Sequence, residues 1–343
     1  MQTWDLQSRS RFFSDLHHND PKEFWKKIAS LSPQECTIPT LSNGSDVAES
    51  NLDKANLLNA TFTNSFNCSL PELRKTDLPE ITDDDIPANF LCTENKVYDL
   101  LCSLDTAKAS GHNGISARML KETALSITPA VTELFNISIR LGEIPDEWKI
   151  ARISPIPKTN DRSNPGKYWP ISLLSVLSKL LEKHVKDLLV YHFEVHCPIF
   201  AMQWGFSCGK STTGALVAAT NEWNKLMDSG LDVCAVFFDY SKAFDTVPHR
   251  LLLQKLKHID IHPQILRWIA HYLCERRQYV CVGGSSSATQ QVISGVPQGS
   301  VLGPLLFIFY INSISAVPLT DGTLSLFADD FNALPCNQNT NWL

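Results

Sequence analysis

The sequence lacks the cysteine spacing and the long apolar run that would place it in several common protein classes. Its ten cysteines include no C-x-x-C pair, which excludes a zinc ribbon and a thioredoxin-type motif. We therefore expect a reducing, intracellular setting, in the cytoplasm or the nucleus. The longest nearly apolar run, Val301–Ile311, is shorter than the roughly 20 residues that a membrane span needs. The start, Met1–Arg11, is polar and does not resemble a signal peptide, so we expect a soluble chain with no membrane partner.

The chain also lacks an excess of positive charge. Its formal net charge is -6 and its pI is near 5.9, which argues against binding to nucleic acid by bulk charge alone. Individual grooves can still be basic. A hydrophobic fraction of 43% and a charged fraction of 19% are typical of an ordinary globular protein. The 343 residues suffice for two or three domains, or for one domain with subdomains.

Two apolar stretches that lie far apart in the sequence both end on carboxylates. The run Val233–Phe238 is followed by Asp239, and Phe327-Ala328 is followed by Asp329 and Asp330. We expect a buried strand before Asp239, and strands seldom end on acids for stability, because burying an unpaired carboxylate is costly. Three carboxylates at one sheet end would repel one another unless divalent cations lie between them, and oxygen ligands favour Mg²⁺ or Mn²⁺. The alternative is an ordinary hairpin turn, where Asp is common.

The remaining pattern alternates helices with short strands. Residues 1–90 suggest a loosely folded approach segment, with a short helix after Pro21. The three acidic residues at 83–85 indicate a solvated loop, and a metal site there is the less plausible alternative. Helices are expected from Thr93, over Ala117–Ala124, Pro129–Leu141, Ile171–Val190, Thr212–Ser229 and Ser300–Ile314, and from near Pro248 and Pro263. Strands are expected at Ile150–Pro157, Gln278–Val282 and Thr289–Ile293, and a hairpin at Leu324–Leu334 with Asp329-Asp330 as its turn.

The stretch Gly205–Thr212 has the composition of a phosphate-binding loop. A P-loop places four residues between its first glycine and Gly-Lys-Ser, whereas three residues separate Gly205 from Gly209 here. No clear strand leads into the stretch. A P-loop NTPase that uses Lys210 is therefore kept only as a remote alternative.

Taken together, the motifs resemble the reverse transcriptases of non-LTR (LINE-type) retrotransposons, in particular the jockey-like group. The stretches Phe237–Asp245, Gly295–Pro304 and Phe327–Asp330 are similar to the palm motifs of that family. Upstream, Ile156–Lys158, Pro170–Leu174 and Gly205-Phe206 are similar to its finger motifs, in the same order. Motifs in a matching order are far more specific than any one of them.

The resemblance implies an α+β fold with the fingers and palm of a right-hand polymerase, in which an antiparallel sheet packs on helices. The implied organisation is an N-terminal helical and linker segment at 1–92, fingers at 93–230 and an incomplete palm at 231–343. Only residues 331–343 follow the Asp pair, so we expect the thumb to be absent and processive synthesis to be weak.

The implied activity is RNA-directed DNA synthesis on an RNA template from a DNA primer, with deoxynucleoside triphosphates as substrates. Asp239, Asp329 and Asp330 would be the catalytic residues and would hold two Mg²⁺ ions, with Mn²⁺ as the alternative. Five residues would contact the nucleotide: Lys158, Tyr240, Phe244, Gln298 and Gly299. Phe244 would exclude a ribose 2′-hydroxyl, although a core Phe is the simpler interpretation of this residue by itself.

Some positions depart from the family pattern. Trp169 stands where the family usually carries an Arg that would grip the triphosphate. This change and the expected loss of the thumb motivate an alternative hypothesis, a catalytically inactive remnant that at most binds RNA.

Overall fold

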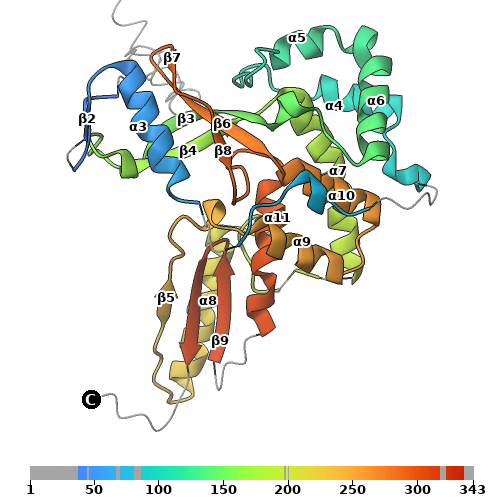
Figure 1. The fold of residues 1–343 in the computed structure, drawn as a ribbon. Helices are drawn as coiled ribbons and strands as arrows, with labels where there is room; N and C mark the ends of the chain where they lie inside the picture. Colours follow the sequence, from blue (N-terminus) through green and yellow to red (C-terminus); the bar gives the residue numbers. More distant parts are fainter. Residues whose placement is uncertain are drawn as a thin grey trace, which may run out of the picture. The chain divides into compact units, whose positions relative to one another are not determined.

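The computed structural model describes residues 38–44, 46–66, 70–80, 86–196, 198–199, 201–316 and 322–335. The chain divides into two units, Met1–Pro39 and Thr40–Leu343, and all the elements described lie in the second (Figure 1). In chain order they are β1 (Leu41–Asn43), β2 (Asp46–Ala48), α3 (Asn51–Thr63), α4 (Glu94–Cys102), α5 (Ala117–Glu122), α6 (Ala124–Leu141), β3 (Ile150–Pro157), β4 (Tyr168–Leu173), α7 (Val176–His196), α8 (Thr212–Asp228), β5 (Val236–Phe238), α9 (His249–His258), α10 (Pro263–Leu273), β6 (Arg276–Val282), β7 (Ser285–Ser286), β8 (Gln290–Val292), α11 (Gly303–Ile311), β9 (Gly322–Phe327) and β10 (Asp330–Pro335).

These elements form a mixed fold of helices and sheets, as predicted. The larger sheet has the order β4-β3-β6-β7, with β8 paired to the other part of β6. β3 and β6 of this sheet run parallel, with Arg152 opposite Tyr279. The expectation of an antiparallel sheet was therefore wrong for this pair of strands. A parallel pair is possible here because several helices lie between the two strands in sequence and return the chain to the same end. A second, smaller sheet has the antiparallel order β5-β10-β9.

The hydrophobic core is built mainly by helices. One cluster of buried side chains joins α4, α6, α7, α9, α10 and α11. In α10, Trp268, Ile269 and Tyr272 are each at most 1% exposed. Burying a side chain of this size contributes roughly 1.5–3 kcal/mol, so α10 is firmly anchored. No helix in the described part of the chain is both long enough and apolar enough to cross a lipid bilayer.

Several helix and strand predictions are confirmed where the signal is local. Thr93 caps α4, with its hydroxyl accepting from Lys96 N at 3.3 Å. Ser211 caps α8 in the same way, accepting from Gly214 N at 3.0 Å. The predicted strand Ile150–Pro157 is β3 without a change in its bounds. Caps and short apolar patterns act within a few residues, which explains why the sequence locates these elements well.

Two predicted helix starts were wrong by five residues, and the helix expected from Ser300 begins three residues later, at Gly303. The helix expected from Pro129 begins at Ala124, and Pro129 lies inside it on the solvent side. Pro129 has no N–H to donate to the carbonyl of Leu125. Leu125 is 82% exposed, so water can reach this carbonyl instead. The helix expected from Ile171 begins at Val176, because Tyr168–Leu173 pairs with β3 as a strand. Pairing with a neighbouring strand overrides the local helical spacing there.

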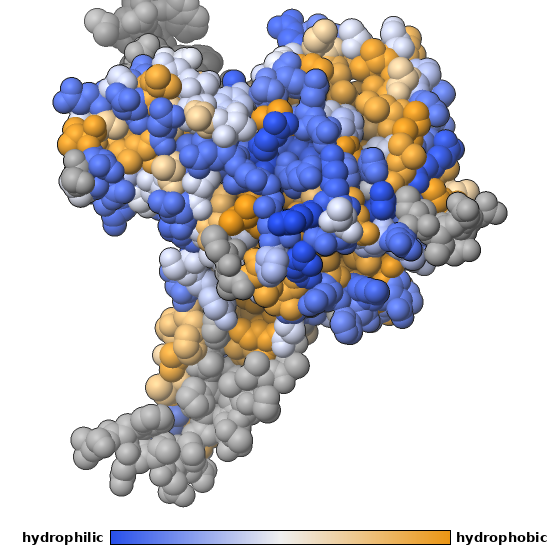
Figure 2. All heavy atoms as spheres, viewed as in Figure 1, coloured by the Kyte–Doolittle hydropathy of each residue, from blue (hydrophilic) through white to orange (hydrophobic). Residues whose placement is uncertain are grey.

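The strand before Asp239 was expected to be buried, and this was wrong. Val236, Phe237 and Phe238 are 39%, 69% and 44% exposed, and Figure 2 shows hydrophobic surface over β5. Among the described residues, β5 pairs only with β10, so it is an edge strand of three residues. The turn of the last hairpin is also one residue earlier than predicted. It is formed by Ala328-Asp329, because Asp330 already pairs with Phe327 as part of β10.

The segment expected to be a loose approach to the fold includes a well-packed helix, α3. Asn59 of this helix is 1% exposed and donates to Ala288 O at 2.8 Å, while Gln278 Nε2 donates to Asn59 Oδ1 at 3.1 Å. α3 is therefore fastened to β6 and to the loop before β8. The helix predicted after Pro21 and the acidic run at 83–85 lie outside the described residues.

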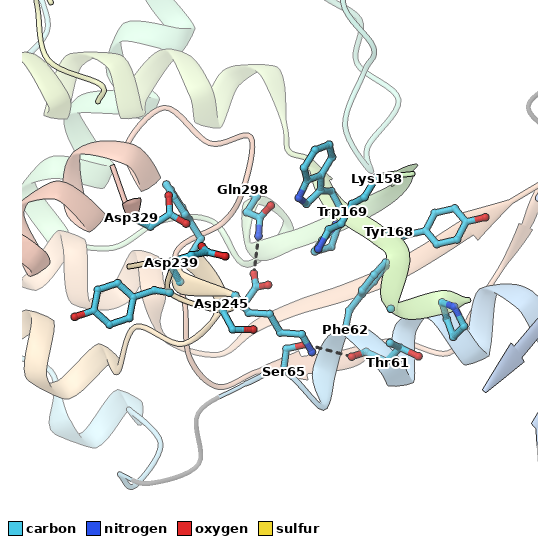
Figure 3. Close-up of a pocket in the computed structure, with 18 of the residues that line it drawn as sticks. Thr61, Phe62, Ser65, Lys158, Tyr168, Trp169, Asp239, Asp245, Gln298 and Asp329 are labelled. Atoms are coloured by element: carbon cyan, nitrogen blue, oxygen red, sulfur yellow. Dashed lines mark hydrogen bonds between the residues drawn. The ribbon is translucent and has the colours of Figure 1, made fainter. Parts of the chain in front are cut away.

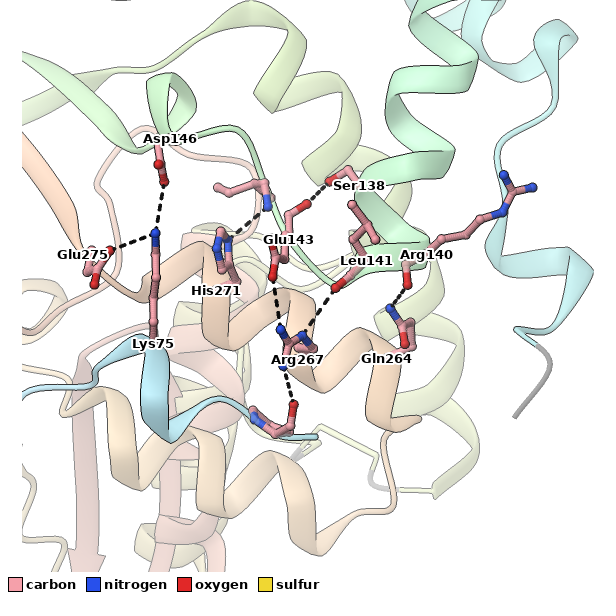
Figure 4. Close-up of polar contacts among 12 residues, drawn as sticks. Lys75, Ser138, Arg140, Leu141, Glu143, Asp146, Gln264, Arg267, His271 and Glu275 are labelled. Atoms are coloured by element: carbon pink, nitrogen blue, oxygen red, sulfur yellow. Dashed lines mark hydrogen bonds and ion pairs between the residues drawn. The ribbon is translucent and has the colours of Figure 1, made fainter. Parts of the chain in front are cut away.

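Residues 75–79 are held to α10 and to Glu275, the residue before β6, by polar contacts (Figure 4). Arg267 donates to Pro79 O at 2.9 Å and forms an ion pair with Glu143 at 3.1 Å. Lys75 pairs with Glu275 at 3.3 Å. Exposed ion pairs contribute little, about 0–1 kcal/mol each, so the backbone contact of Arg267 matters more than the pair formed by Lys75.

Candidate active site

The smaller sheet, the larger sheet and α3 border one cavity of about 620 Å³ (Figure 3). We call it the carboxylate cavity, after the four aspartates in its lining. Seven of the eight predicted site residues line it: Lys158, Asp239, Tyr240, Phe244, Gln298, Asp329 and Asp330. The fold thus brings together residues from four separate sequence motifs.

Strand register places the carboxylates at one end of the smaller sheet. Phe238 of β5 pairs with Phe331 of β10 in antiparallel register. Asp239 follows Phe238 and Asp330 precedes Phe331, so the two aspartates face each other across the continuing register. Asp329 lies in the hairpin turn just before Asp330. Asp239 and Asp329 lie close together at one side of the cavity in Figure 3.

The electrostatics of this group favour a bound cation. Burial raises the pKa of Asp329 above its usual value, and the charges of Asp330 and Asp239 raise it further. A divalent cation would relieve this repulsion. No cluster of three or more acidic, histidine or cysteine side chains suited to a metal ion occurs among the described residues. The aspartates nevertheless fit Mg²⁺, which proteins usually hold by one or two carboxylates, with waters and substrate phosphates completing the shell.

Phe244 is both a packed side chain and part of the cavity wall. Its ring stacks on Phe307, with centroids 4.5 Å apart, and meets the edge of Phe206 at 6.0 Å. The interpretation as a packed Phe is therefore confirmed, and exclusion of a ribose 2′-hydroxyl stays a prediction. Because two neighbouring rings fix it, Phe244 presents a rigid apolar surface to the cavity.

Gln298 reaches the cavity from a loop whose backbone is fixed against β4. Ser172 N donates to Gln298 O at 2.8 Å. Gly299 does not line the cavity and instead lies against the same strand. Its φ is +99°, and a Cβ there would lie 2.9 Å from Ser172 O, so only glycine fits without strain.

Asp245 is a site residue that sequence reasoning missed. It lines the cavity, and its Oδ1 accepts a hydrogen bond from Gln298 Nε2 at 2.9 Å. Burial raises the pKa of Asp245, which the bond from Gln298 and the charges of Lys242 and Lys158 partly offset. Asp245 ends the motif that begins at Phe237, so its position was visible in the sequence. Its role was not visible, because this role depends on Gln298, which lies more than 50 positions away in the sequence.

α3 supplies a wall of the cavity that nothing in the sequence indicated. Thr61 and Phe62 line the cavity from its last turn, and Ser65 follows that helix. Ser65 Oγ accepts from Lys242 Nζ at 2.7 Å. This bond ties the end of α3 to the segment just after Asp239.

Lys158, just after β3, and Trp169, in β4, both line the cavity. Lys158 Nζ is 5.8 Å from the centroid of the Trp169 ring, a cation–π distance. The two residues are brought together by the pairing of β3 with β4, which sets Ile156 opposite Trp169. The indole therefore contacts the one lysine that the sequence nominated for the triphosphate.

The stretch that resembles a P-loop is explained by local structure. Lys210 Nζ donates to the carbonyls of Ala201 and Gln203, the latter at 2.9 Å. Ser211 caps α8, and Gly205 packs against the backbone of Ala328. The lysine and the serine are thus used within the fold, and the P-loop alternative is not favoured.

Comparison with known proteins supports the sequence resemblance. The family model described as "Reverse transcriptase (RNA-dependent DNA polymerase)" matches residues 156–340. The chain is 31% identical over 245 residues to the RNA-directed DNA polymerase from mobile element jockey of Drosophila melanogaster, covering 69% of this chain and 27% of that protein.

Two further relatives from the same organism align over longer stretches. They are the probable RNA-directed DNA polymerases from transposon BS, at 29% identity over 324 residues, and from transposon X-element, at 29% identity over 318 residues. These alignments cover 90% and 89% of this chain, but 36% and 35% of the relatives. The chain thus spans about a third of the length of these proteins.

Proposed function

Because this chain belongs to the reverse transcriptase (RNA-dependent DNA polymerase) family, we propose that it is the RNA-directed DNA polymerase domain of a jockey-like non-LTR retrotransposon. The observation that carries the proposal is the register of β5 and β10, which sets Asp239 opposite Asp330 and beside Asp329 at the carboxylate cavity. The end of β5 and the start of β10 come from motifs that lie far apart in the sequence, and each carries an aspartate of the family motifs.

The proposed reaction joins a deoxynucleotide to a primer. The 3′-hydroxyl of a DNA primer attacks the α-phosphate of a deoxynucleoside triphosphate opposite an RNA template, and pyrophosphate leaves. Asp239 and Asp329 would hold two Mg²⁺ ions, or Mn²⁺, with Asp330 adding charge. Such ions lower the charge of the reacting phosphate and of the attacking and leaving oxygens. The rest of the catalysis comes from positioning, to which the rigid cavity wall contributes.

The nucleotide would lie in the carboxylate cavity. Lys158 would meet the triphosphate, and Phe244 would bar a ribose 2′-hydroxyl. Gln298 and Tyr240 would contact the nucleotide directly, and Gly299 would let the loop backbone approach β4. We further propose fingers at 93–230 and a palm at 231–343, preceded by an N-terminal segment at 1–92, and an intracellular site of action.

Primer extension tests the proposal. The purified chain should incorporate deoxynucleotides on a poly(rA) template with an oligo(dT) primer when Mg²⁺ is present. Asp329→Asn should reduce the rate by at least about a hundredfold, the usual effect of removing one electrostatic group from an active site. Asp228→Asn, at the exposed end of α8, is the matched control and should leave the rate unchanged. Equal incorporation by the Asp329 variant and the wild type would reject the proposal.

A further inference from the structure

We infer that Gln203 is the positioning residue for Asp329, acting through the hairpin turn that carries this carboxylate. The inference rests on the proposed function, because it assigns Gln203 to the holding of the divalent cation. Gln203 does not line the carboxylate cavity, and it is 2% exposed.

The carboxamide of Gln203 binds both polar groups of the residue just before Asp329. Its Oε1 accepts from Ala328 N at 2.9 Å, and its Nε2 lies 3.4 Å from Ala328 O, to which it donates. The same Oε1 accepts from Gly205 N at 2.9 Å. One buried side chain therefore links the turn to the segment before α8.

Backbone contacts hold this side chain in place. Trp204 N donates to Leu326 O at 2.8 Å, and Leu326 N donates to Met202 O at 3.0 Å. Gln203 itself forms a parallel bridge with Leu326. The segment 202–204 thus runs alongside the end of β9, and Gln203 points along it to the turn.

The turn needs such support because of its backbone conformation. Ala328 has a φ of +58°, in the left-handed region that residues with a Cβ rarely adopt. Gly205 allows the close approach, since a Cβ there would lie 2.3 Å from Ala328 N. A change of Ala328 to negative φ would redirect the chain at Asp329 and move its carboxylate away from Asp239.

Three variants test the inference. Gln203→Met keeps the length of the side chain and removes every hydrogen bond to Ala328. Adding Ala328→Gly to that variant lets the turn adopt positive φ without a Cβ. Gln264→Met is the matched control: Gln264 is 1% exposed and donates to Ile139 O and Arg140 O, in the contact between α6 and α10 (Figure 4).

The readout is Mn²⁺ affinity, measured by electron paramagnetic resonance without nucleic acid or nucleotide, beside urea unfolding of each variant. We expect Gln203→Met to weaken Mn²⁺ binding about tenfold or more, the usual cost of losing a group that orients a ligand. The double variant should recover at least half of that loss on a logarithmic scale. Gln264→Met should lower stability and leave Mn²⁺ affinity unchanged. In primer extension, Gln203→Met should need more Mg²⁺ at an unchanged KM for the nucleotide.

Three results would overturn the inference alone. These are wild-type Mn²⁺ affinity in Gln203→Met, an equal loss of affinity in Gln264→Met, and no recovery in the double variant. A wild-type chain that fails to bind Mn²⁺ would also overturn the inference alone. The proposed function fails only if primer extension is equal in Asp329→Asn and the wild type, so the two failures are distinguishable.

Discussion

Gln298 Nε2 lies 2.9 Å from Asp245 Oδ1, to which it donates a hydrogen bond. The bond joins the Gly295–Ser300 loop to the turn that follows Asp239. Beside it, Val296 N donates to Phe244 O at 2.8 Å and Ser294 Oγ donates to Asp245 O at 2.7 Å. The two predicted nucleotide contacts, Phe244 and Gln298, are therefore held as one unit.

Asp245→Leu should weaken use of the nucleotide. The change removes the acceptor of Gln298 and the charge near Lys242 and Lys158. Hydrogen bonds to charged groups are worth about 1.5–3 kcal/mol, so kcat/KM for the deoxynucleotide should fall at least about tenfold. Gln298→Leu should cost at least as much, because it removes the same bond and the proposed contact with the nucleotide. The double variant should cost little more than Gln298→Leu alone. Steady-state kinetics of all three variants measure kcat/KM. Additive losses in the double variant would mean that the bond between Gln298 and Asp245 does not contribute to use of the nucleotide.

Phe244→Ala should relax discrimination against ribonucleotides. Removing the ring opens space at the cavity wall where a 2′-hydroxyl would otherwise meet an apolar surface. We expect the ratio of ribonucleotide to deoxynucleotide incorporation to rise about tenfold or more, in line with about 1–3 kcal/mol for a small steric difference in a pocket. Phe193→Ala removes a ring stacked on Phe309 at 4.8 Å, outside the cavity lining, and should not change this ratio. A rise of the same size in Phe193→Ala would assign the effect to general loosening of the core.

Trp169→Arg should tighten binding of the triphosphate. Trp169 is 48% exposed, lines the cavity and lies 5.8 Å from Lys158 Nζ, measured to the ring centroid. A guanidinium there can donate two hydrogen bonds to one phosphate. We expect KM for the nucleotide to fall about tenfold with little change in kcat. Trp169→Leu is the control, because it removes the indole without adding a guanidinium. An equal fall in KM for that variant would show that the guanidinium is not the cause.

Stability should decline as the pH falls below about 6.5. Burial lowers the pKa of His249 to about 4, while its Nε2 donates to Gly295 O at 2.7 Å and Arg276 adds to the lowering. Between pH 6.5 and 4 the unfolded chain binds a proton that the folded chain excludes, so this contribution is present above that window and is lost on acidification. From pH 7.5 to 5, His249 alone should account for a loss of about 2 kcal/mol.

Urea unfolding at both pH values measures that loss. In His249→Gln the pH-dependent loss should shrink by about this amount, whereas His196→Gln, at an exposed position, should behave as the wild type. His271, whose pKa burial lowers to about 4, should account for part of the remaining pH dependence. An unchanged pH dependence in His249→Gln would contradict the assignment.

The sequence alone determined the family, the order of the motifs and the elements with local signals. The caps at Thr93 and Ser211 and the alternation of Ile150–Pro157 act within a few residues, so they could be recognised without a fold. The nomination of Asp239, Asp329 and Asp330 followed from motifs that are each contiguous in the chain. All three aspartates line the carboxylate cavity.

Only the tertiary structure decided which distant residues meet. The exposure of β5, the strand at Tyr168–Leu173 and the cavity wall supplied by α3 all depend on pairing or packing with segments far away in sequence. The bonds from Gln203 to Ala328 and from Gln298 to Asp245 each span more than 50 positions. Such contacts form only when the whole chain fixes the register of its strands, and a one-residue slip would turn each side chain to the other face.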